Sequence, residues 1–103
     1  MRVLITGAGG FVGQWACRDL SEAGHEVIPS DAEPSASGSA LLDITQPEHI
    51  ESVLKEHKPE ACLHLGGIAF VPLSWEQPDL VYRVNTLGTL NLLEGLRALR
   101  VEL

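Results

Sequence analysis

Three glycines near the N-terminus have a spacing that suits contact with a phosphate group. Gly7, Gly10 and Gly13 stand in the stretch ITGAGGFVG, between a short apolar run and a segment with helical periodicity. The first glycine allows a tight turn, the second lets a pyrophosphate approach the backbone, and the third allows a helix to pack closely on a strand. Free N–H groups at the start of the helix, which begins at Phe11, would bind the phosphates. The spacing therefore predicts a dinucleotide-binding turn.

An aspartate after the second apolar run supports this interpretation. Asp31 lies about 20 residues beyond the glycines, where a carboxylate can accept hydrogen bonds from both ribose hydroxyls of an adenosine. Its charge would repel a 2′-phosphate, so we predict NAD as the cofactor, with NADP second to it. The alternative is that the glycines and Asp31 serve only the geometry of a strand-to-turn connection.

Short apolar runs alternate with helical patterns, and these elements must position the glycines and the aspartate. The runs at 3–6, 27–29, 41–44 and 61–65 indicate strands, and the apolar periodicity indicates helices starting near 11, 45 and 78. Thr45 and Glu48 form a capping-box pattern at the second helix, and the third is expected to run to about residue 100. Residues 32–39 indicate a loop.

This alternation predicts an α/β fold with a parallel sheet in strand order 3-2-1-4 and helices on both faces. That order is the first half of a doubly wound dinucleotide-binding fold plus one strand. Residues 101–103 would begin a fifth strand that the chain does not complete.

Composition sets limits on the function. A chain of 103 residues is expected to form one domain, and its net charge of -7 without a Lys/Arg cluster argues against nucleic acid and anionic membranes as partners. The sequence has neither a signal-peptide core nor an apolar run of membrane-spanning length, which predicts a cytoplasmic protein. Cys17 and Cys62 are expected to be buried thiols, no metal site is predicted, and His64 is expected to be a hydrogen-bonded core histidine.

Four segments of the sequence match known motifs. Thr6–Gly13 is similar to the signature T-G-x-x-G-[FYI]-[IVL]-G, and Asp43-Ile44 to a D-[ILV] pair. The segment His64–Gly67 resembles H-L-A-A, and Asn85–Thr89 resembles N-V-x-G-T. Together they resemble the extended short-chain dehydrogenases/reductases, the NAD-dependent epimerase/dehydratase family with a Rossmann-type fold, which acts mainly on nucleotide sugars and in which the D-[ILV] pair contacts adenine. Residues 71–78, VPLSWEQP, are most similar to the GDP-sugar branch, the GDP-4-keto-6-deoxymannose reductases and GDP-mannose dehydratases, some of which accept NADPH.

The resemblance implies one set of cofactor-binding residues: Gly7, Gly10, Phe11, Val12, Gly13, Asp31, Asp43, Ile44, Leu65, Gly66, Gly67 and Asn85. Those at 7–13 would face the pyrophosphate, Asp31 the adenosine ribose, and those at 43–44 the adenine. Those at 65–67 would line the nicotinamide-side ribose, with Asn85 bracing their loop. Two alternatives stay open, namely that Asp43 merely ends a strand and that Asn85 is a helix-packing amide. Glycines replace the usual alanines at 66–67, which predicts a more flexible loop.

The family's chemistry requires a Tyr-x-x-x-Lys pair, which this sequence lacks. Its one tyrosine, Tyr82, is followed four positions later by Thr86, and Lys55 and Lys58 fall on a different predicted helix. We therefore predict no catalytic residue in the chain. Residues 1–103 are expected to be the N-terminal, cofactor-binding part of a nucleotide-sugar epimerase, dehydratase or reductase, whose nucleotide-sugar substrate binds only in a longer form. The alternative is a free-standing, non-catalytic dinucleotide-binding or sensor module, which a Tyr-x-x-x-Lys encoded downstream would exclude.

The fourth predicted strand suggests one further partner. With no complete fifth strand beside it, the strand at 61–65 would leave a row of backbone N–H and C=O groups unpaired. Apolar edges of this kind pair with other chains, so self-association through this strand is expected.

Overall fold

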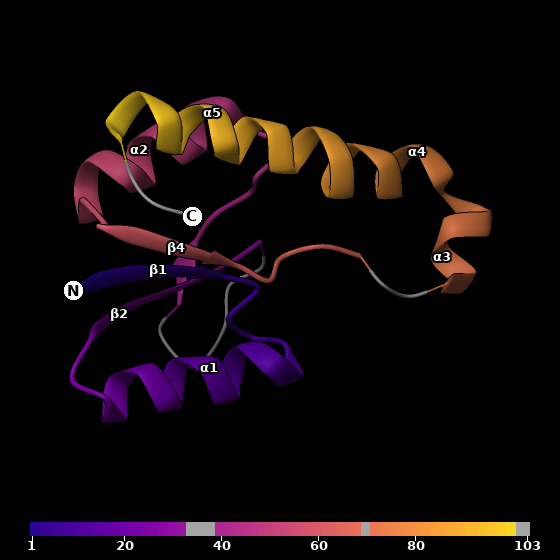
Figure 1. The fold of residues 1–103 in the computed structure, drawn as a ribbon. Helices are drawn as coiled ribbons and strands as arrows, with labels where there is room; N and C mark the ends of the chain where they lie inside the picture. Colours follow the sequence, from indigo (N-terminus) through magenta and orange to yellow (C-terminus); the bar gives the residue numbers. More distant parts are fainter. Residues whose placement is uncertain (33–38, 69–70, 101–103) are drawn as a thin grey trace.

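The computed structural model describes residues 1–32, 39–68 and 71–100, which form a parallel four-stranded sheet flanked by helices (Figure 1). The strands are β1 (Arg2–Thr6), β2 (Glu26–Asp31), β3 (Ala40–Leu41) and β4 (Ala61–His64). They lie in the order β3-β2-β1-β4, and each neighbouring pair is parallel. The α/β class and the strand order 3-2-1-4 are thereby confirmed.

The central strand β1 is buried on both faces, as its continuous apolar sequence predicts. Leu4 pairs in register with Ile28 of β2 and Cys62 of β4. Because side chains alternate along a strand, Leu4 and Ile5 enter different core clusters, and both are fully buried.

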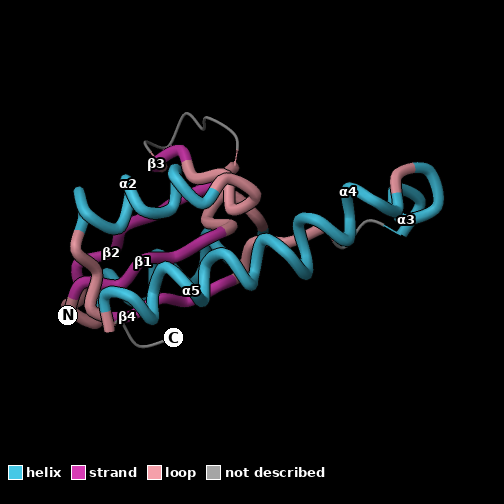
Figure 2. The backbone as a smooth tube through the Cα atoms, turned by 90° about the horizontal axis from the view of Figure 1, so that it is seen from above, coloured by secondary structure: helices cyan, strands magenta, loops and turns pink. Residues whose placement is uncertain are grey.

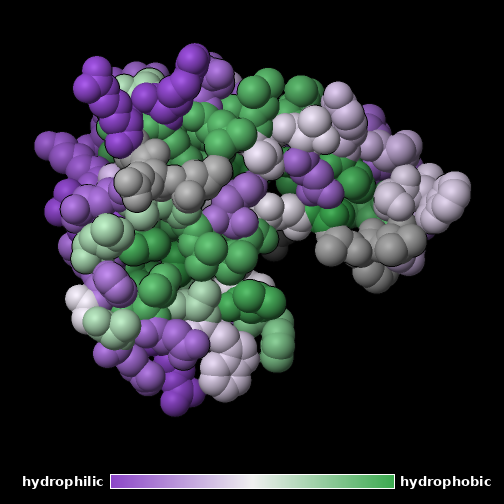
Figure 3. Space-filling view, viewed as in Figure 1, coloured by the Kyte–Doolittle hydropathy of each residue, from purple (hydrophilic) through white to green (hydrophobic). Residues whose placement is uncertain are grey.

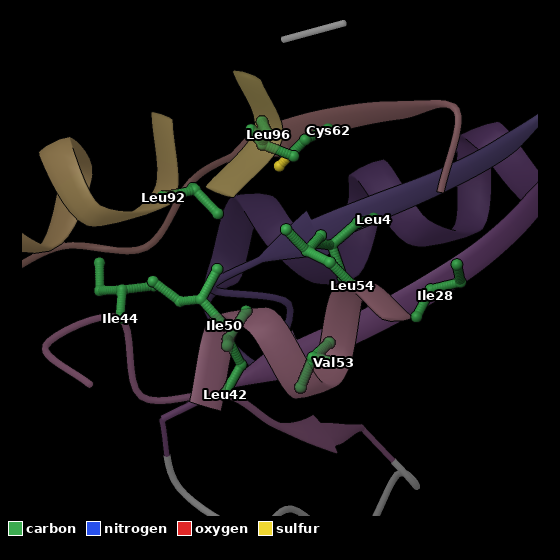
Figure 4. Packing of buried hydrophobic residues seen from close by; sticks show 10 residues of the cluster. All are labelled: Leu4, Ile28, Leu42, Ile44, Ile50, Val53, Leu54, Cys62, Leu92 and Leu96. Atoms are coloured by element: carbon green, nitrogen blue, oxygen red, sulfur yellow. The ribbon is translucent and has the colours of Figure 1, made fainter. Parts of the chain in front are cut away.

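Helices cover both faces of the sheet, as expected (Figure 1). Helix α1 (Phe11–Glu22) packs on one face, where its residues Ala16, Cys17 and Leu20 meet Val3 and Ile5. Helices α2 (Pro47–His57) and α5 (Thr89–Leu99) cover the other face. Between them and the sheet lies the larger cluster of buried side chains shown in Figure 4: Leu4, Ile28, Leu42, Ile44, Ile50, Val53, Leu54, Cys62, Leu92 and Leu96.

The strand predicted at 41–44 is shorter than expected. After Leu41 the chain leaves the sheet, because the Asp43 carboxylate accepts hydrogen bonds from both the backbone N–H and the hydroxyl of Thr45. The same contacts make the predicted capping box wrong. Thr45 is engaged with Asp43, so α2 begins at Pro47 with Gln46 as an N-cap that makes no side-chain hydrogen bond.

The helix predicted from 78 to 100 is not one regular helix. It consists of α4 (Pro78–Tyr82), a π-helical segment η1 (Arg83–Gly88) and α5, and a short helix α3 (Val71–Glu76) that the sequence pattern missed precedes it. Figures 1 and 2 show α3 and α4 projecting beyond the end of the sheet. The buried residues of this segment accordingly lie near the sheet: Gly88 at the end of η1, and Leu92 and Leu96 on α5. The expected loop at 33–38 and fifth strand at 101–103 lie outside the described residues.

Candidate cofactor-binding site

The connection from β1 into α1 needs glycine at two positions for reasons of packing, Gly7 after the strand and Gly13 in the first turn of the helix. Gly7 has φ +67°, and a Cβ on it would stand 2.8 Å from the backbone N of Gly66. A Cβ on Gly13 would overlap the carbonyl oxygen of Gly7. No side chain fits at either place, so both glycines are required by the fold itself.

Gly10 differs from these two glycines because the fold does not require it. It is the N-cap of α1 with extended backbone (φ −74°), and a Cβ there would approach one atom within 4 Å, the Gly7 carbonyl oxygen at 3.4 Å. A side chain at Gly10 would therefore point into open space in front of the helix. No side-chain hydrogen bond caps α1, and its first turn contains no acidic residue. This arrangement suits an anion at the helix N-terminus.

The exposed side chains of Phe11 and Val12 begin α1. Phe11 is 82% and Val12 62% exposed, so neither side chain packs in the core. Their backbone N–H groups belong to the first turn of the helix, whose N–H groups have no intrahelical acceptor. A contact from these two residues to a phosphate would therefore be made by their backbone.

Asp31, the last residue of β2, lies beside the glycine turn. Its Oδ2 accepts a hydrogen bond from the backbone N–H of Gly9 at 2.9 Å, and its Oδ1 accepts one from Ala32 at 2.8 Å. The sheet order brings the ends of β1 and β2 together at the same edge, which is where dinucleotides bind in such sheets. The structure thus brings together the two features that the sequence spacing singled out.

The pair Asp43-Ile44 has structural partners of its own. Asp43 Oδ1 accepts hydrogen bonds from the Thr45 N–H at 3.0 Å and the Thr45 hydroxyl at 2.7 Å, so this carboxylate does shape the chain after β3. The Ile44 side chain is buried in the core, where it lies against Gly88. An adenine contact from Ile44 would thus have to come from its backbone.

The loop after β4 forms the opposite side of the site. The backbone N–H groups of Leu65 and Gly66 both donate to the hydroxyl oxygen of Thr6 at 3.0 Å. Further along, the side-chain amide of Asn85 accepts from the Ile68 N–H at 2.6 Å and donates to the Ile68 carbonyl at 2.8 Å. Asn85 therefore braces this loop, as the resemblance implies. Hydrogen bonds hold both ends of the loop, although the glycines at 66 and 67 predict a more flexible one. Beside the loop is a cavity of about 290 Å³.

Sequence reasoning missed the roles of Thr6 and Thr89 and identified that of His64. The imidazole of His64 is hydrogen-bonded through Nδ1 to Thr6 Oγ1 at 2.5 Å and through Nε2 to Thr89 Oγ1 at 3.1 Å. Burial lowers the pKa of His64 from its ordinary value of 6.5. The expected hydrogen bonding of this histidine is confirmed, but His64 is half-buried and lines the cavity, so its expected place in the core is wrong. The two threonines belong to the T-G and G-T pairs of the family motifs, which was the available signal for them.

The remaining predicted side chains are placed as follows. Cys62 is buried as expected, and burial raises the pKa of its thiol to about 12. The same expectation is wrong for Cys17, which is half-buried because it lies at the margin of the cluster between α1 and the sheet. Across the described ranges, no three His, Cys, Asp or Glu side chains are grouped so that they could hold a metal ion. No helix in the part of the chain that the structure describes has the length and apolar character needed to cross a membrane.

A parallel sheet in this order, with a glycine turn after β1 and an acid at the end of β2, defines a Rossmann-type protein. The chain belongs to the NAD-dependent epimerase/dehydratase family, whose model matches residues 3–103. This confirms the family inferred from the sequence motifs.

Two curated relatives illustrate the breadth of this similarity. The GDP-6-deoxy-D-talose 4-dehydrogenase of Aggregatibacter actinomycetemcomitans is 36% identical over 98% of this chain and 32% of its own length. A UDP-glucose 4-epimerase of Klebsiella pneumoniae is 30% identical over 99% of this chain and 84% of its own length.

Solved structures give the same fold. The UDP-glucose 4-epimerase of Thermus thermophilus in complex with NAD has a TM-score of 0.89 and 37% identity, covering 99% of this chain and 35% of that one. The dTDP-4-dehydrorhamnose reductase of Bacillus anthracis in complex with NADP has a TM-score of 0.84 and 27% identity, covering 97% and 34%. This chain therefore spans about a third of the length of most of these relatives, and the family includes both NAD and NADP complexes.

Proposed function

We propose that residues 1–103 bind NAD through the β1–α1 turn, as the cofactor-binding part of a nucleotide-sugar epimerase, dehydratase or reductase. The observation that carries the proposal is the contrast among the glycines of the turn. Gly7 and Gly13 are needed for packing, whereas a Cβ on Gly10 would enter space that the fold leaves open. That space lies in front of the N-terminus of α1, where a pyrophosphate would be bound by backbone N–H groups.

Asp31 supports NAD as the preferred cofactor. Each of its carboxylate oxygens already accepts one backbone N–H, which fixes the group beside the turn, and each retains lone pairs for a ribose hydroxyl. A 2′-phosphate at the same place would meet this negative charge. The NAD complex of the Thermus relative agrees with this preference, while the NADP complex of the Bacillus relative shows that the family accommodates both.

The loop after β4 is proposed to line the nicotinamide half of the cofactor. When bound, NAD would supply hydride acceptance and donation. The chain's own part is to hold Leu65, Gly66 and Gly67 in place, through Thr6 on one side and Asn85 on the other. Residues 1–103 contain no Tyr-x-x-x-Lys pair to move a proton at a sugar oxygen. We therefore propose that these residues bind the cofactor without turnover, and that the nucleotide-sugar is bound only in a longer protein.

Calorimetric titration of the purified chain with NAD and NADP, combined with a turnover assay, tests this proposal. We expect saturable NAD binding, weaker NADP binding, and no turnover of UDP-glucose or a GDP-sugar above background. A Gly10→Val variant is the matched control, because its added methyl groups would occupy the pyrophosphate position. Failure of the wild-type chain to bind NAD, or turnover that disappears in Gly10→Val, would contradict the proposal.

A further inference from the structure

A closed set of hydrogen bonds links the two halves of the cofactor site, and His64 stands at its centre. On one side its Nδ1 meets the hydroxyl of Thr6, the last residue of β1 and the residue before the glycine turn. That hydroxyl oxygen also accepts the N–H groups of Leu65 and Gly66 at 3.0 Å each. His64 therefore contacts the atom that holds the start of the loop.

On its other side, His64 contacts Thr89, the first residue of α5, which follows the η1 segment whose Asn85 holds the end of the loop. Its Nε2 lies 3.1 Å from the hydroxyl oxygen of Thr89, and that hydroxyl donates to the carbonyl oxygen of Asn85 at 3.0 Å. The Asn85 amide in turn pairs with both backbone polar groups of Ile68. With the exception of Thr6, the residues of this hydrogen-bonded set line the cavity of about 290 Å³ beside the loop.

Counting protons identifies the tautomer of His64. The single hydroxyl proton of Thr89 goes to Asn85, so Thr89 Oγ1 must accept from His64, and Nε2 carries the imidazole proton. Thr6 Oγ1 already accepts two N–H groups, so its own proton must point at Nδ1. Every donor then has an acceptor only when the imidazole is neutral.

We propose that neutral His64 is a positioning residue of this site, which holds the loop after β4 against the glycine turn, and that its protonation releases the loop and weakens NAD binding. A proton on Nδ1 would face an oxygen whose lone pairs are both in use, and the Thr6 hydroxyl proton would lose its acceptor. Either the contact between His64 and Thr6 or one of the two loop hydrogen bonds to Thr6 Oγ1 must then break. The Leu65 N–H keeps the backbone carbonyl oxygen of Thr6, 3.2 Å away, as a second acceptor, so the loss falls on the Gly66 N–H. The predicted weakening of NAD binding rests on the proposed function, whereas the predicted release of the loop does not.

Within this hydrogen-bonded set, His64 is the side chain that can change its protonation state. Among the described residues its hydrogen-bond partners, Thr6 and Thr89, do not ionise. Because burial lowers the pKa of His64, protonation is expected only below pH 6.5. The charged groups on the elements around it are exposed and in ion pairs: Arg2 on β1 with Glu60, Arg83 on η1 with Asp79, and Glu94 with Arg97 on α5. The other histidines lie elsewhere: His25 at the N-terminal amine, His49 at the Asp43 N–H and His57 near Glu56.

NAD titrations across pH test the proposal with two variants. His64→Asn keeps an oxygen that can accept from Thr6 but does not titrate, and His57→Asn makes the same change on α2. We expect the wild-type dissociation constant to rise about fivefold from pH ~7.5 to pH ~5, the loss of about one hydrogen bond. We expect His57→Asn to follow the wild type and His64→Asn to stay nearly constant. An unchanged wild-type affinity, or the wild-type pH dependence in His64→Asn, would overturn the proposal.

NMR without cofactor separates this proposal from the proposed function. Long-range ¹H–¹⁵N spectra are expected to show the imidazole proton of His64 on Nε2 at neutral pH. The protection factors of the Gly66 and Ile68 amide protons, which correct for the slower intrinsic exchange at lower pH, are expected to fall as His64 becomes protonated. A proton on Nδ1 at neutral pH, or protection factors at both amides that do not change with the protonation of His64, would overturn the inference whether or not NAD binds.

Discussion

The Asp31 carboxylate accepts a hydrogen bond from the backbone N–H of Gly9, with 2.9 Å between Oδ2 and N. This contact joins the end of β2 to the turn after β1, and it places a fixed negative charge beside the space in front of Gly10. The Gln14 side chain donates to the Gly9 carbonyl at 3.2 Å and holds the same peptide from the helix side. The geometry of the turn and the position of the charge are thus coupled.

Cofactor preference should depend on this charge. Two unit charges about 4 Å apart interact by roughly 4 kcal/mol at an effective dielectric constant near 20, and solvent around the exposed site reduces this value. We expect Asp31→Asn to lower the preference for NAD over NADP by about tenfold, measured by calorimetric titration with both cofactors. Asp19→Asn, an exposed aspartate on α1, is the charge-matched control. Equal binding of NAD and NADP to the wild-type chain would contradict this assignment of Asp31.

The glycines of the turn should separate binding from folding. Gly10→Val is expected to abolish NAD binding while lowering the free energy of unfolding by about 1 kcal/mol or less, because its Cβ enters open space and the cost is that of a poorer N-cap. Gly13→Ala is expected to destabilise the fold by about 1–3 kcal/mol, since its Cβ would overlap the Gly7 carbonyl oxygen. Urea denaturation of both variants measures the difference. A stable Gly13→Ala protein, or an unfolded Gly10→Val protein, would reverse the two roles.

Thiol reactivity should report the burial of the two cysteines. The thiolate is the reactive form, and burial raises the pKa of Cys62 to about 12. Burial also raises the pKa of the half-buried Cys17. At pH ~8 we expect iodoacetamide to label Cys17 slowly and Cys62 only through unfolding, and the two to react alike in urea. Mass spectrometry of the labelled peptides would contradict this if Cys62 reacted as fast as Cys17 in the folded chain.

The edge of the sheet should control self-association of residues 1–103. Within the described sheet β4 pairs with β1 alone, and Leu63 on this strand is 37% exposed. Figure 3 shows apolar side chains across the middle of the face on which β4 lies. We expect concentration-dependent association in sedimentation velocity, reduced by Leu63→Lys because charged side chains blunt strand edges. Leu90→Lys, on the exposed side of α5, is the control and should have no such effect. A wild-type chain that stays monomeric at high concentration would contradict this prediction.

Much of the fold could be predicted because local patterns and general rules of topology agree. The alternation of strands and helices, with right-handed crossovers, was sufficient for the order β3-β2-β1-β4. The glycine spacing and Asp31 could be combined because parallel strands end at the same edge of the sheet. The remaining features have no periodic signal in the sequence. The hydrogen bonds between Asp43 and Thr45 end β3 early, and η1 is a local widening of the helix. The bonds of His64 to Thr6 and Thr89 join segments that are far apart in the sequence.

The central claim is that NAD binds at the carboxyl end of this sheet, and an amide-resolved NMR titration tests it most directly. The ¹⁵N-labelled chain is titrated with NAD, and the shift of each backbone N–H signal is followed. We predict saturable changes at Gly9–Gly13, at Asp31 and Ala32, and at Leu65–Ile68, all absent in Gly10→Val. An unchanged spectrum, or changes confined to the groove between α2 and α5 around Glu51, Lys55 and Gly95, would contradict the claim.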